Sequence, residues 1–407
     1  MVSVTEAHRI IEDRIPPLRE EKIKLSVAAG RILATNVKAP FPMPRFDNSA
    51  MDGFAVRAED TEGATQINPV ELKSIGVIPA GSSGDLRLKP GQCAQVMTGA
   101  VIPSGADAVI MVENTSGFDE SGIVRIFTTV QPGDHIRRQG EEISQGAVLI
   151  RRGTPITTAE IGVLATFGYA SVSVTVPVRV AIFTTGDELQ EPGTELKSGQ
   201  IYNSNLPVIS DLVQRAGSRI IIQRLLRDDQ NELKVALQEA LETADVVIST
   251  GGISMGRFDF LRLILKELSV KEHFWKVAQK PGKPLYFGSR GKTLVFSLPG
   301  NPVSAFIGFM VWVWPVLEKM QGKQPNHFLE AVLTTPFPRE ETKYRFLFGK
   351  VEVNKGKLVC RPAEKIGSHM LSSALEANCI LEVEPGKEQL PVGSKIIVQI
   401  LPWKSIV

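Results

Sequence analysis

Apolar residues recur at helical spacing in two short segments that lie far apart in the sequence. In residues 4–15 they fall on one helical face, and Pro16-Pro17 ends the segment. A second helix is predicted at 157–167, where Thr157-x-x-Glu160 has the form of a capping box and Gly168 that of a C-terminal stop. We expect these two helices to belong together, with the chain between them inserted as a separate domain.

The chain between the two helices has the pattern of a small β-domain. A proline-rich and then polar stretch, residues 40–56, reads as a linker that opens this domain. Short apolar runs broken by Gly and Pro follow as far as about residue 139, as expected for short strands. These runs are GFAV, AQVMTGA, ADAVIMVE and GIVRIFTTV.

Residues 177–325 change to an alternation of strand-like and helical patterns. The strand-like runs are VRVAIFTT (178–185), SRIIIQRL (218–225), ADVVIST (244–250) and TLVFSLP (293–299). Helical patterns at 205–217, 231–244, 258–268 and 302–320 separate or follow them. Such alternation predicts a parallel sheet with helices on both faces. The tail, 326–407, is β-like again, with 351–360 as a hairpin.

Composition and charge narrow the class of protein without changing this picture. A chain of 407 residues is too long for one core, so two to four domains are expected. A net charge of +2 without Lys/Arg blocks gives no case for nucleic-acid binding. The longest apolar run, Val303 to Leu317, is shorter than the roughly 20 residues that span a bilayer, so a buried helix is expected. Three scattered cysteines and a charged N-terminus predict a cytoplasmic protein without a membrane partner.

Three of the predicted parallel strands end in distinctive loops: TTGDE (184–188), STGGISMG (249–256) and SLPGNP (297–302). Ligands of open α/β sheets bind outside the carboxyl ends of the strands, so these loops could converge on one ligand. The second loop contains G-x-S-x-G, the nucleophile elbow of serine hydrolases, with Ser254 at its centre. The candidate acid Glu272 and base His273 adjoin each other, and adjacent residues rarely point together, so a serine nucleophile is disfavoured.

The glycine-rich turn fits an anion cradle better than a nucleophile. The chain lacks both G-x-G-x-x-G and the P-loop signature, which disfavours assignment as a dinucleotide-binding enzyme or a P-loop NTPase. Glycines before a helix let backbone N–H groups turn toward a phosphate. Asp259 in the first helical turn has two readings, as a simple helix cap or, with Asp187 or Glu188, as a Mg²⁺ ligand. Lys280 and Lys283, in KPGKP, would supply two cations beside such a cradle.

Taken in order, the motifs of this chain resemble molybdopterin molybdenumtransferase, the MoeA type, which is also the E-domain of gephyrin. The resemblance covers essentially the whole chain, and the joint order and spacing of the motifs are highly specific. The motifs are DNSAMDGFAV (47–56), VMTGAVIPSGADAVI (96–110), GEEI (140–143), TTGDEL (184–189), GQIYNSN (199–205), STGGISMGRFDF (249–260), KPGKPLYFG (280–288), SLPGNPVSAF (297–306) and GSHMLSSALEANC (367–379).

The resemblance implies a multidomain protein of the α/β plus β class, with a central MogA-like, parallel-sheet α/β domain that binds molybdopterin. The implied domains are a discontinuous helical one (1–44 and 140–176), an inserted β-rich one (45–139), the α/β domain (177–325) and a C-terminal β-barrel-like one (326–407). It also implies a homodimer whose active sites join the α/β domain of one subunit to the inserted domain of the other. Such enzymes take adenylylated molybdopterin and molybdate, and release AMP with the assistance of Mg²⁺. A MogA-type adenylyltransferase would act upstream as a partner.

The resemblance also implies roles for individual residues. Glu188 and Asp259 would be acidic site residues and metal ligands, directly or through water, and Asp52, Thr98 and Glu142 would reach across the dimer. Lys280, Lys283 and Ser368 match positions tied to oxyanion binding. The remaining substrate-binding positions are Asn203, Ser204, Thr250, Gly251, Gly252, Ser254, Pro299 and Pro302.

Two departures from the family pattern leave the choice between molybdate and tungstate open. Glu142 stands where the family often has Asp, and Phe348 stands where an arginine is usual, with Arg345 nearby. Two rival functions also remain. MogA-type adenylyltransferases and CinA-like amidases share only the α/β module, and the motifs SAMDG and MTGA lie outside it. A non-catalytic scaffold like gephyrin is disfavoured by the presence of Glu188, Asp259 and both lysines.

Overall fold

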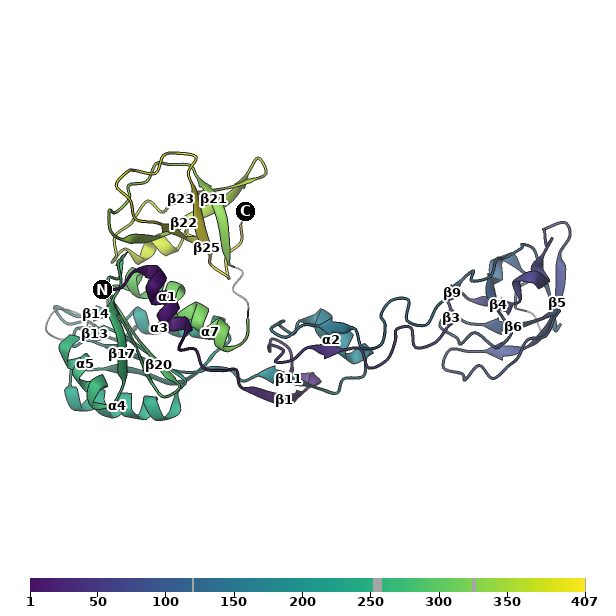
Figure 1. The fold of residues 1–407 in the computed structure, drawn as a ribbon, viewed down its shortest axis with the longest axis horizontal. Coiled ribbons are helices and arrows are strands. Elements are labelled where there is room, and N and C mark those ends of the chain that lie inside the picture. The colour runs from purple at the N-terminus through teal and green to yellow at the C-terminus, as the bar shows by residue number, and fades with distance from the viewer. Residues whose placement is uncertain (119–120, 252–257, 324–326, 407) are drawn as a thin grey trace. The chain divides into compact units, whose positions relative to one another are not determined.

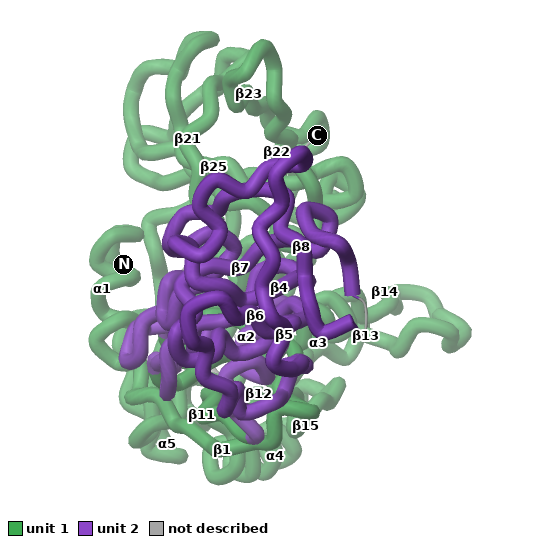
Figure 2. The backbone as a smooth tube through the Cα atoms, turned by 90° about the vertical axis from the view of Figure 1, so that its right-hand side faces the viewer, with its two compact units in different colours: residues 1–35, 152–157, 171–407 green, residues 36–151, 158–170 purple. Residues whose placement is uncertain are grey.

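The structure, a computed structural model, describes residues 1–118, 121–251, 258–323 and 327–406. The chain forms two compact units, shown in different colours in Figure 2. The first unit contains residues 1–35, 152–157 and 171–407, and the second contains residues 36–151 and 158–170.

The centre of the first unit is a six-stranded sheet. Its strand order is β15 (Arg219–Leu226), β12 (Arg179–Thr185), β16 (Val246–Thr250), β20 (Thr293–Leu298), β19 (Pro284–Arg290) and β17 (Lys271–Lys276). The first four strands are parallel, as the apolar runs predict. The last two pair antiparallel and form an edge that the sequence analysis did not identify.

Helices cover both faces of this sheet, which confirms the predicted α/β class (Figure 1). Along β12, Val180 and Ile182 face one helical layer, while Ala181 and Phe183 face the other. This alternation explains why the strand reads as a continuous apolar run. One layer contains α1 (Val4–Glu12), α3 (Asn205–Arg215), α6 (Pro302–Gly308) and α7 (Trp314–Met320), and the other α4 (Gln230–Thr243) and α5 (Phe258–Glu267).

The helical segment Pro302–Met320 is long and apolar enough to cross a membrane by length and composition, yet 89% of it is buried inside the protein. It consists of α6, a π-helical turn at Phe309–Val313, and α7. Pro315 is tolerated because it lies in the first turn of α7, directly after the π-helical turn. The buried helix expected from the sequence is confirmed.

The N-terminal helix α1 packs on the α/β sheet through Val4, Ala7 and Ile11. Its first turn is capped by Ser3, whose Oγ accepts the Glu6 N–H at 3.1 Å. We expected α1 and the helix α2 (Thr158–Thr166) to belong together; the two helices fall in different compact units. Two strands of the first unit, β1 (Glu20–Lys24) and β11 (Ser171–Thr175), pair as an antiparallel ribbon. A short 3-10 turn at Leu25–Val27 follows β1.

The C-terminal part of the first unit is a closed five-stranded barrel. Its strands are β21 (Phe328–Leu333), β22 (Tyr344–Asn354), β23 (Lys357–Pro362), β24 (Cys379–Val383) and β25 (Lys395–Ile400), and pairing of β22 with β24 closes it. The predicted hairpin at 351–360 is present, and its turn places Lys355 and Gly356 at φ of 48° and 76°. A 3-10 turn at Leu371–Ala374 lies between β23 and β24.

The second unit contains a five-stranded sheet. Its order is β7 (Ala108–Met111), β4 (Gly53–Val56), β6 (Gln92–Val96), β5 (Val70–Ile78) and β8 (Ile123–Ile126). Four of these strands match predicted runs, whereas β5 was not identified from the sequence. Two small strand pairs accompany the sheet, β2 (Val37–Lys38) with β10 (Val148–Ile150), and β3 (Asn48–Ser49) with β9 (Ile136–Arg137). Short 3-10 turns follow β4 at Ala58–Thr61 and β7 at Val112–Asn114.

Candidate active site

A cavity of about 840 Å³ lies at the carboxyl edge of the parallel sheet, between the α/β domain and the barrel. Thr185 at the end of β12, Thr250 at the end of β16 and Pro299 after β20 all line it. The chain runs from β12 to β15 on one side and then returns to β16 on the other, so the cavity lies at a topological switch point. The described parts of the three distinctive strand-end loops therefore converge, as the sequence predicts; residues 252–256 of the second loop lie outside the described residues.

Most of the site residues expected in the first unit line this cavity. They are Glu188, Asn203, Ser204, Thr250, Gly251, Lys280, Pro299, Pro302 and Ser368. Lys283 is not among the lining residues; it is exposed, and its carbonyl accepts the Val277 N–H at 3.0 Å. Gly252 and Ser254 lie outside the described residues, as does the side chain of Asp259, whose backbone lies in the first turn of α5.

The end of β16 carries a buried hydroxyl at the cavity. Thr250 is 1% exposed, and its Oγ1 has no hydrogen-bond partner among the described residues. Gly251 follows with φ of 92°, and a Cβ there would lie 2.2 Å from the Thr185 carbonyl oxygen. Only glycine therefore fits at this turn. A buried hydroxyl without a partner costs free energy, so this one is suited to a ligand.

A loop after β12 forms the rim of the cavity. It carries Glu188 and a small parallel strand pair, β13 (Leu189–Gln190) with β14 (Ile201–Tyr202). The Glu188 carboxylate lies over Gly186, where a Cβ would come within 2.9 Å of its oxygens. The rim thus presents one carboxylate toward the cavity opening.

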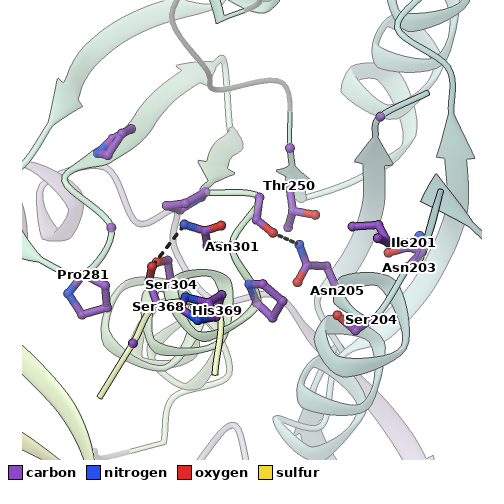
Figure 3. A pocket seen from close by; sticks show the side chains of 18 of the residues that line it. Ile201, Asn203, Ser204, Asn205, Thr250, Pro281, Asn301, Ser304, Ser368 and His369 are labelled. Atoms are coloured by element: carbon purple, nitrogen blue, oxygen red, sulfur yellow. Dashed lines mark hydrogen bonds between the residues drawn. The ribbon is translucent and has the colours of Figure 1, made fainter. Parts of the chain in front are cut away.

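The two expected residues at the start of α3 differ in what their side chains do (Figure 3). The Asn203 amide donates to Thr184 Oγ1 at 2.7 Å and its Oδ1 accepts the Leu206 N–H at 3.2 Å, so it joins β12 to the first turn of α3. Ser204 also lines the cavity, and its side chain makes no capping hydrogen bond to the helix. Asn203 therefore shapes the cavity wall by holding two elements together.

The loop between β20 and α6 is fixed by asparagines that the sequence analysis did not select. Asn205 donates to the Gly300 carbonyl at 2.7 Å, and Asn301 donates to Ser368 Oγ at 3.2 Å (Figure 3). The second bond joins the α/β domain to the barrel across the cavity. Their position directly after a strand, beside the chosen Asn203 and Pro302, is the signal that could have found them.

Two cations that line the cavity, Lys280 and Arg345, lie at paired positions on neighbouring strands. Lys280 pairs with Glu340 at 2.7 Å, and this lysine lowers the pKa of the Glu340 carboxyl. Arg345 is 8% exposed, donates from Nη1 to the Pro338 carbonyl at 3.0 Å and has no partner for Nε among the described residues. Burial lowers the pKa of Arg345, and Glu340 partly offsets this. A partly unsatisfied guanidinium beside a lysine favours an anion.

Phe348 does not reach the cavity. Its ring packs edge-on against Phe306 at 5.0 Å within the hydrophobic core, whereas Arg345 and Leu347, on the other face of β22, line the cavity. Since side chains alternate along a strand, an arginine at 348 would point away from the cavity. Arg345 is thus the cavity arginine contributed by the barrel.

The alternative of a serine hydrolase gains no support from the described residues. Glu272 forms a two-point ion pair with Arg262 at 2.8 Å, and His273 Nε2 contacts Ser289 Oγ at 2.8 Å. Both lie on the edge strand β17 and neither lines the cavity. These two side chains are engaged with other partners rather than with each other.

In the second unit, Asp52 and Thr98 lie together. Asp52 Oδ1 accepts from the Thr98 backbone N–H at 2.7 Å and from Thr98 Oγ1 at 2.9 Å. These bonds lower the pKa of Asp52, the backbone bond most, so the carboxylate stays charged. Glu142 lies in another loop, is exposed, and donates its N–H to the Met43 carbonyl at 3.1 Å.

Comparison with known proteins covers nearly the whole chain. Three family models match, described as the MoeA N-terminal region, domains I and II (2–168), a probable molybdopterin binding domain (181–319) and the MoeA C-terminal region, domain IV (330–401). The chain is 34% identical to the molybdopterin molybdenumtransferase of Haemophilus influenzae, over 98% of each chain. It is 36% identical to that of Bacillus subtilis, over 94% of this chain and 90% of the relative.

A solved structure gives the same result. The molybdopterin biosynthesis MoeA protein of Pyrococcus horikosii superposes with a TM-score of 0.86 at 30% identity, over 98% of this chain and 99% of the other. Full-length coverage, the order of the three regions and the MogA-like domain around the cavity agree. The chain therefore belongs to the MoeA family of molybdopterin molybdenumtransferases, which are transferases of molybdenum cofactor biosynthesis.

Proposed function

We propose that this protein inserts molybdate into adenylylated molybdopterin and releases AMP, giving molybdenum cofactor. The observation that carries the proposal is the cavity of about 840 Å³ at the sheet's carboxyl edge, in which hydrogen-bond donors and two cations face one space. Both substrates are anions, so ammonium, guanidinium, hydroxyl and backbone N–H groups are the chemistry that would bind them. Membership of the MoeA family supports the same assignment.

The cavity divides into two sides with different residues. On the strand side, Thr250 and Gly251, with Ser204 and the loop at Pro299 and Pro302, would hold the phosphorylated pterin. Gly252 and Ser254, next in the chain, would extend this cradle. On the barrel side, Lys280, Arg345 and Ser368 would bind molybdate, and Lys283 would add positive charge from outside the lining. This division lets the oxyanion approach the pterin within one cavity.

The described donor set fits a Mg²⁺ ion held partly by substrate. No group of three or more metal-ligating side chains occurs within the described ranges. Mg²⁺ commonly takes only one or two carboxylates together with water and phosphate oxygens. Glu188 and Asp228 line the cavity, and Asp259 begins the adjoining helix, so these residues would hold the ion. Mg²⁺ bound there would neutralise charge on the phosphoanhydride.

The residues of the second unit enter the proposal through a homodimer. We propose that Asp52, Thr98 and Glu142 of one subunit complete the cavity of the other. The preformed Asp52–Thr98 pair supports this, because it holds a charged carboxylate at a fixed position on an exposed surface. Glu142 is exposed as well, and its additional methylene relative to Asp extends its reach. The proposed domain division (1–44 with 140–176, 45–139, 177–325 and 326–407) places all three at or next to the inserted β-domain.

A direct assay tests the proposal. Purified protein is mixed with adenylylated molybdopterin, MgCl₂ and sodium molybdate, and AMP release and active cofactor are measured; parallel reactions contain tungstate or EDTA. We expect AMP with molybdate and none with EDTA. Higher turnover with tungstate would make the chain a tungstate-preferring version of the enzyme. No AMP with either oxyanion would refute the enzyme and leave the gephyrin-like scaffold.

Asp259→Ala separates binding from turnover. Because Asp259 is assigned to the metal, the variant should retain adenylylated molybdopterin and lose AMP release. Unchanged turnover would remove Asp259 from the site. The proposed cytoplasmic location and the partnership with a MogA-type adenylyltransferase are tested separately, by fractionation and by measuring whether that enzyme's product reaches this protein in a coupled reaction.

A further inference from the structure

The segment that carries Lys280 is clamped by the N-terminus on one side and the barrel on the other. The Val2 N–H donates to the Lys276 carbonyl, and the Ala278 N–H donates to the Val2 carbonyl, both at 2.9 Å. On the barrel side, the short strand β18 (Gln279–Lys280) pairs in parallel with β22, which places Lys280 opposite Arg345. The two cavity cations therefore occupy paired positions on neighbouring strands.

A buried glutamine side chain joins this segment to the core helix. Gln279 is 2% exposed; its Nε2 donates to the Gly282 carbonyl at 2.9 Å, and its Oε1 accepts the Trp312 indole N–H at 3.0 Å. Trp312 is itself buried in the π-helical turn, and His8 of α1 stacks on it with ring centroids 4.4 Å apart. Gln279 thus closes the turn that contains Lys280. It also ties this turn to Trp312 of the π-helical turn, on which α1 stacks through His8.

The hydrophobic core alone does not explain a glutamine at this position. Burying an amide is costly unless its polar atoms are hydrogen-bonded, and an apolar residue of equal volume would be about as stable. A glutamine adds two directional hydrogen bonds, which fix the position of the Gly282 carbonyl relative to the Trp312 ring. Lys280 lies between Gln279 and Gly282 in the sequence and lines the cavity.

We propose that Gln279 is a positioning residue for the oxyanion: through Gly282 and Trp312 it holds Lys280 at the spacing from Arg345 that molybdate requires. The inference rests on the proposed function, because it takes molybdate to be the oxyanion. Gln279 itself does not line the cavity, so it acts through Lys280 and not by contact. Its loss should weaken molybdate affinity while leaving the strand side of the cavity intact.

The test uses Gln279→Met in the full-length protein, which keeps the volume and removes both hydrogen bonds. We expect the KM for molybdate, and its Kd measured by calorimetry with sodium molybdate alone, to rise about tenfold, the size of one good hydrogen bond. The kcat at saturating molybdate and the KM for adenylylated molybdopterin should change less than about twofold. A role confined to folding would not produce this separation.

Gln399→Met is the matched control. Gln399 is 1% exposed and donates from Nε2 to the Met310 carbonyl of the same helical segment at 3.0 Å, but it lies on β25 and does not line the cavity. The control should lose stability in urea denaturation without any change in molybdate affinity. An equal rise in the molybdate KM for Gln399→Met, or no rise for Gln279→Met, overturns the inference.

A second variant guards against a Gln279 variant that fails to fold. Trp312→Phe keeps an aromatic ring for His8 to stack on and removes the indole N–H donor, so it should raise the molybdate KM in the same direction; the smaller ring also costs stability, which urea denaturation measures separately. In the double variant, Gln279→Met with Trp312→Phe, the two increases in molybdate KM should not add, since both substitutions break the same Gln279–Trp312 hydrogen bond. Full additivity of the two increases overturns the inference. The wild type distinguishes failure of this inference from failure of the proposed function. If only the inference is wrong, the wild type still binds molybdate and releases AMP; if the proposed function is wrong, the wild type does neither.

Discussion

The cavity of the first unit and the Asp52 turn of the second unit differ in whether their hydrogen bonds are already made. In the cavity, Thr250 Oγ1 and Arg345 Nε are buried without partners among the described residues. In the second unit, Asp52 is exposed, yet Thr98 already supplies it with two hydrogen bonds. These two cavity donors are thus buried with a bond unmade, whereas the Asp52 carboxylate is exposed with its bonds complete.

This difference separates two electrostatic tasks. Buried donors without partners gain most when an anion supplies the missing acceptors, because nothing in the protein has to be broken first. A carboxylate held in place by its own neighbours does not attract an anion; it orients a hydroxyl, a water or a metal ligand sphere. We therefore expect changes in the cavity to act mainly on binding, and changes at Asp52 to act mainly on turnover.

The largest effect is expected from Lys280→Met, which removes an ammonium from the cavity and keeps its apolar stem. We expect kcat/KM for molybdate to fall about 10²-fold, as for removal of one preorganised charge partner. The matched control is Lys395→Met, because Lys395 also pairs with a glutamate at 2.7 Å but lies on the barrel outside the cavity. Steady-state kinetics measure both variants. An equal fall in kcat/KM for Lys280→Met and Lys395→Met would show that loss of any paired lysine has this effect, whether or not it lies in the cavity.

Asp52→Asn should lower kcat about tenfold, within the range of a positioned acid–base or orienting group, and leave both KM values close to wild type. The substitution keeps an acceptor for Thr98 but removes the charge. Asp107→Asn is the control in the same unit, since Asp107 Oδ1 also accepts a backbone N–H, that of Ala58 at 2.7 Å. A change in KM alone at Asp52 would contradict the division between binding and turnover.

A smaller effect is expected from Thr250→Val, and it runs in opposite directions for stability and binding. Valine has the shape of threonine without the unpaired hydroxyl, so stability in urea should stay equal or rise by up to about 1 kcal/mol. The KM for adenylylated molybdopterin should rise about fivefold, the worth of one neutral hydrogen bond. Thr293→Val, whose Oγ1 donates to the Ala244 carbonyl at 3.0 Å, should lose stability and keep its KM.

The smallest effect concerns the stability of the Asp52 turn with pH. Hydrogen bonds from Thr98 lower the pKa of Asp52 below its usual value near 3.8. The ionised carboxylate therefore favours the folded state above that usual pKa, and the contribution is lost as pH falls through the lower folded value. Denaturation of wild type and Asp52→Asn should show a small difference at pH 7 that disappears in acid. A difference that grows in acid would contradict the assigned hydrogen bonds.

Much of the first unit's architecture could be predicted from sequence because burial on both faces leaves a clear signal. The four parallel strands read as continuous apolar runs, and their helices alternate with them. The antiparallel edge strand β17, KEHFWK, mixes charged and aromatic residues, since it is buried only in part, and so was missed. Strand β5 in the second unit was missed for the same reason, since charged residues interrupt its apolar ones and it is only intermittently buried.

The candidate site was less completely predictable, because several of its residues depend on which face of a strand they occupy. Lys280 and Ser368, which the motifs select, line the cavity, but nothing in the motifs shows that Asn301 and Ser368 meet across it. The arginine of the barrel could not be assigned by alignment alone. Only the alternation along β22 shows that Arg345 faces the cavity and Phe348 the core.

That same strand has a consequence for how the oxyanion preference of this family can evolve. Within four consecutive positions, β22 supplies Arg345 to the cavity, Phe346 and Phe348 to the core beneath the barrel, and Leu347 to the barrel interior. If Arg345 binds the oxyanion as proposed, a sequence change here would alter selectivity and folding together, so few intermediates would survive selection. The loop at 367–369 carries cavity residues outside the hydrophobic core, so drift toward a new oxyanion should begin there, at positions other than Ser368, which bonds to Asn301.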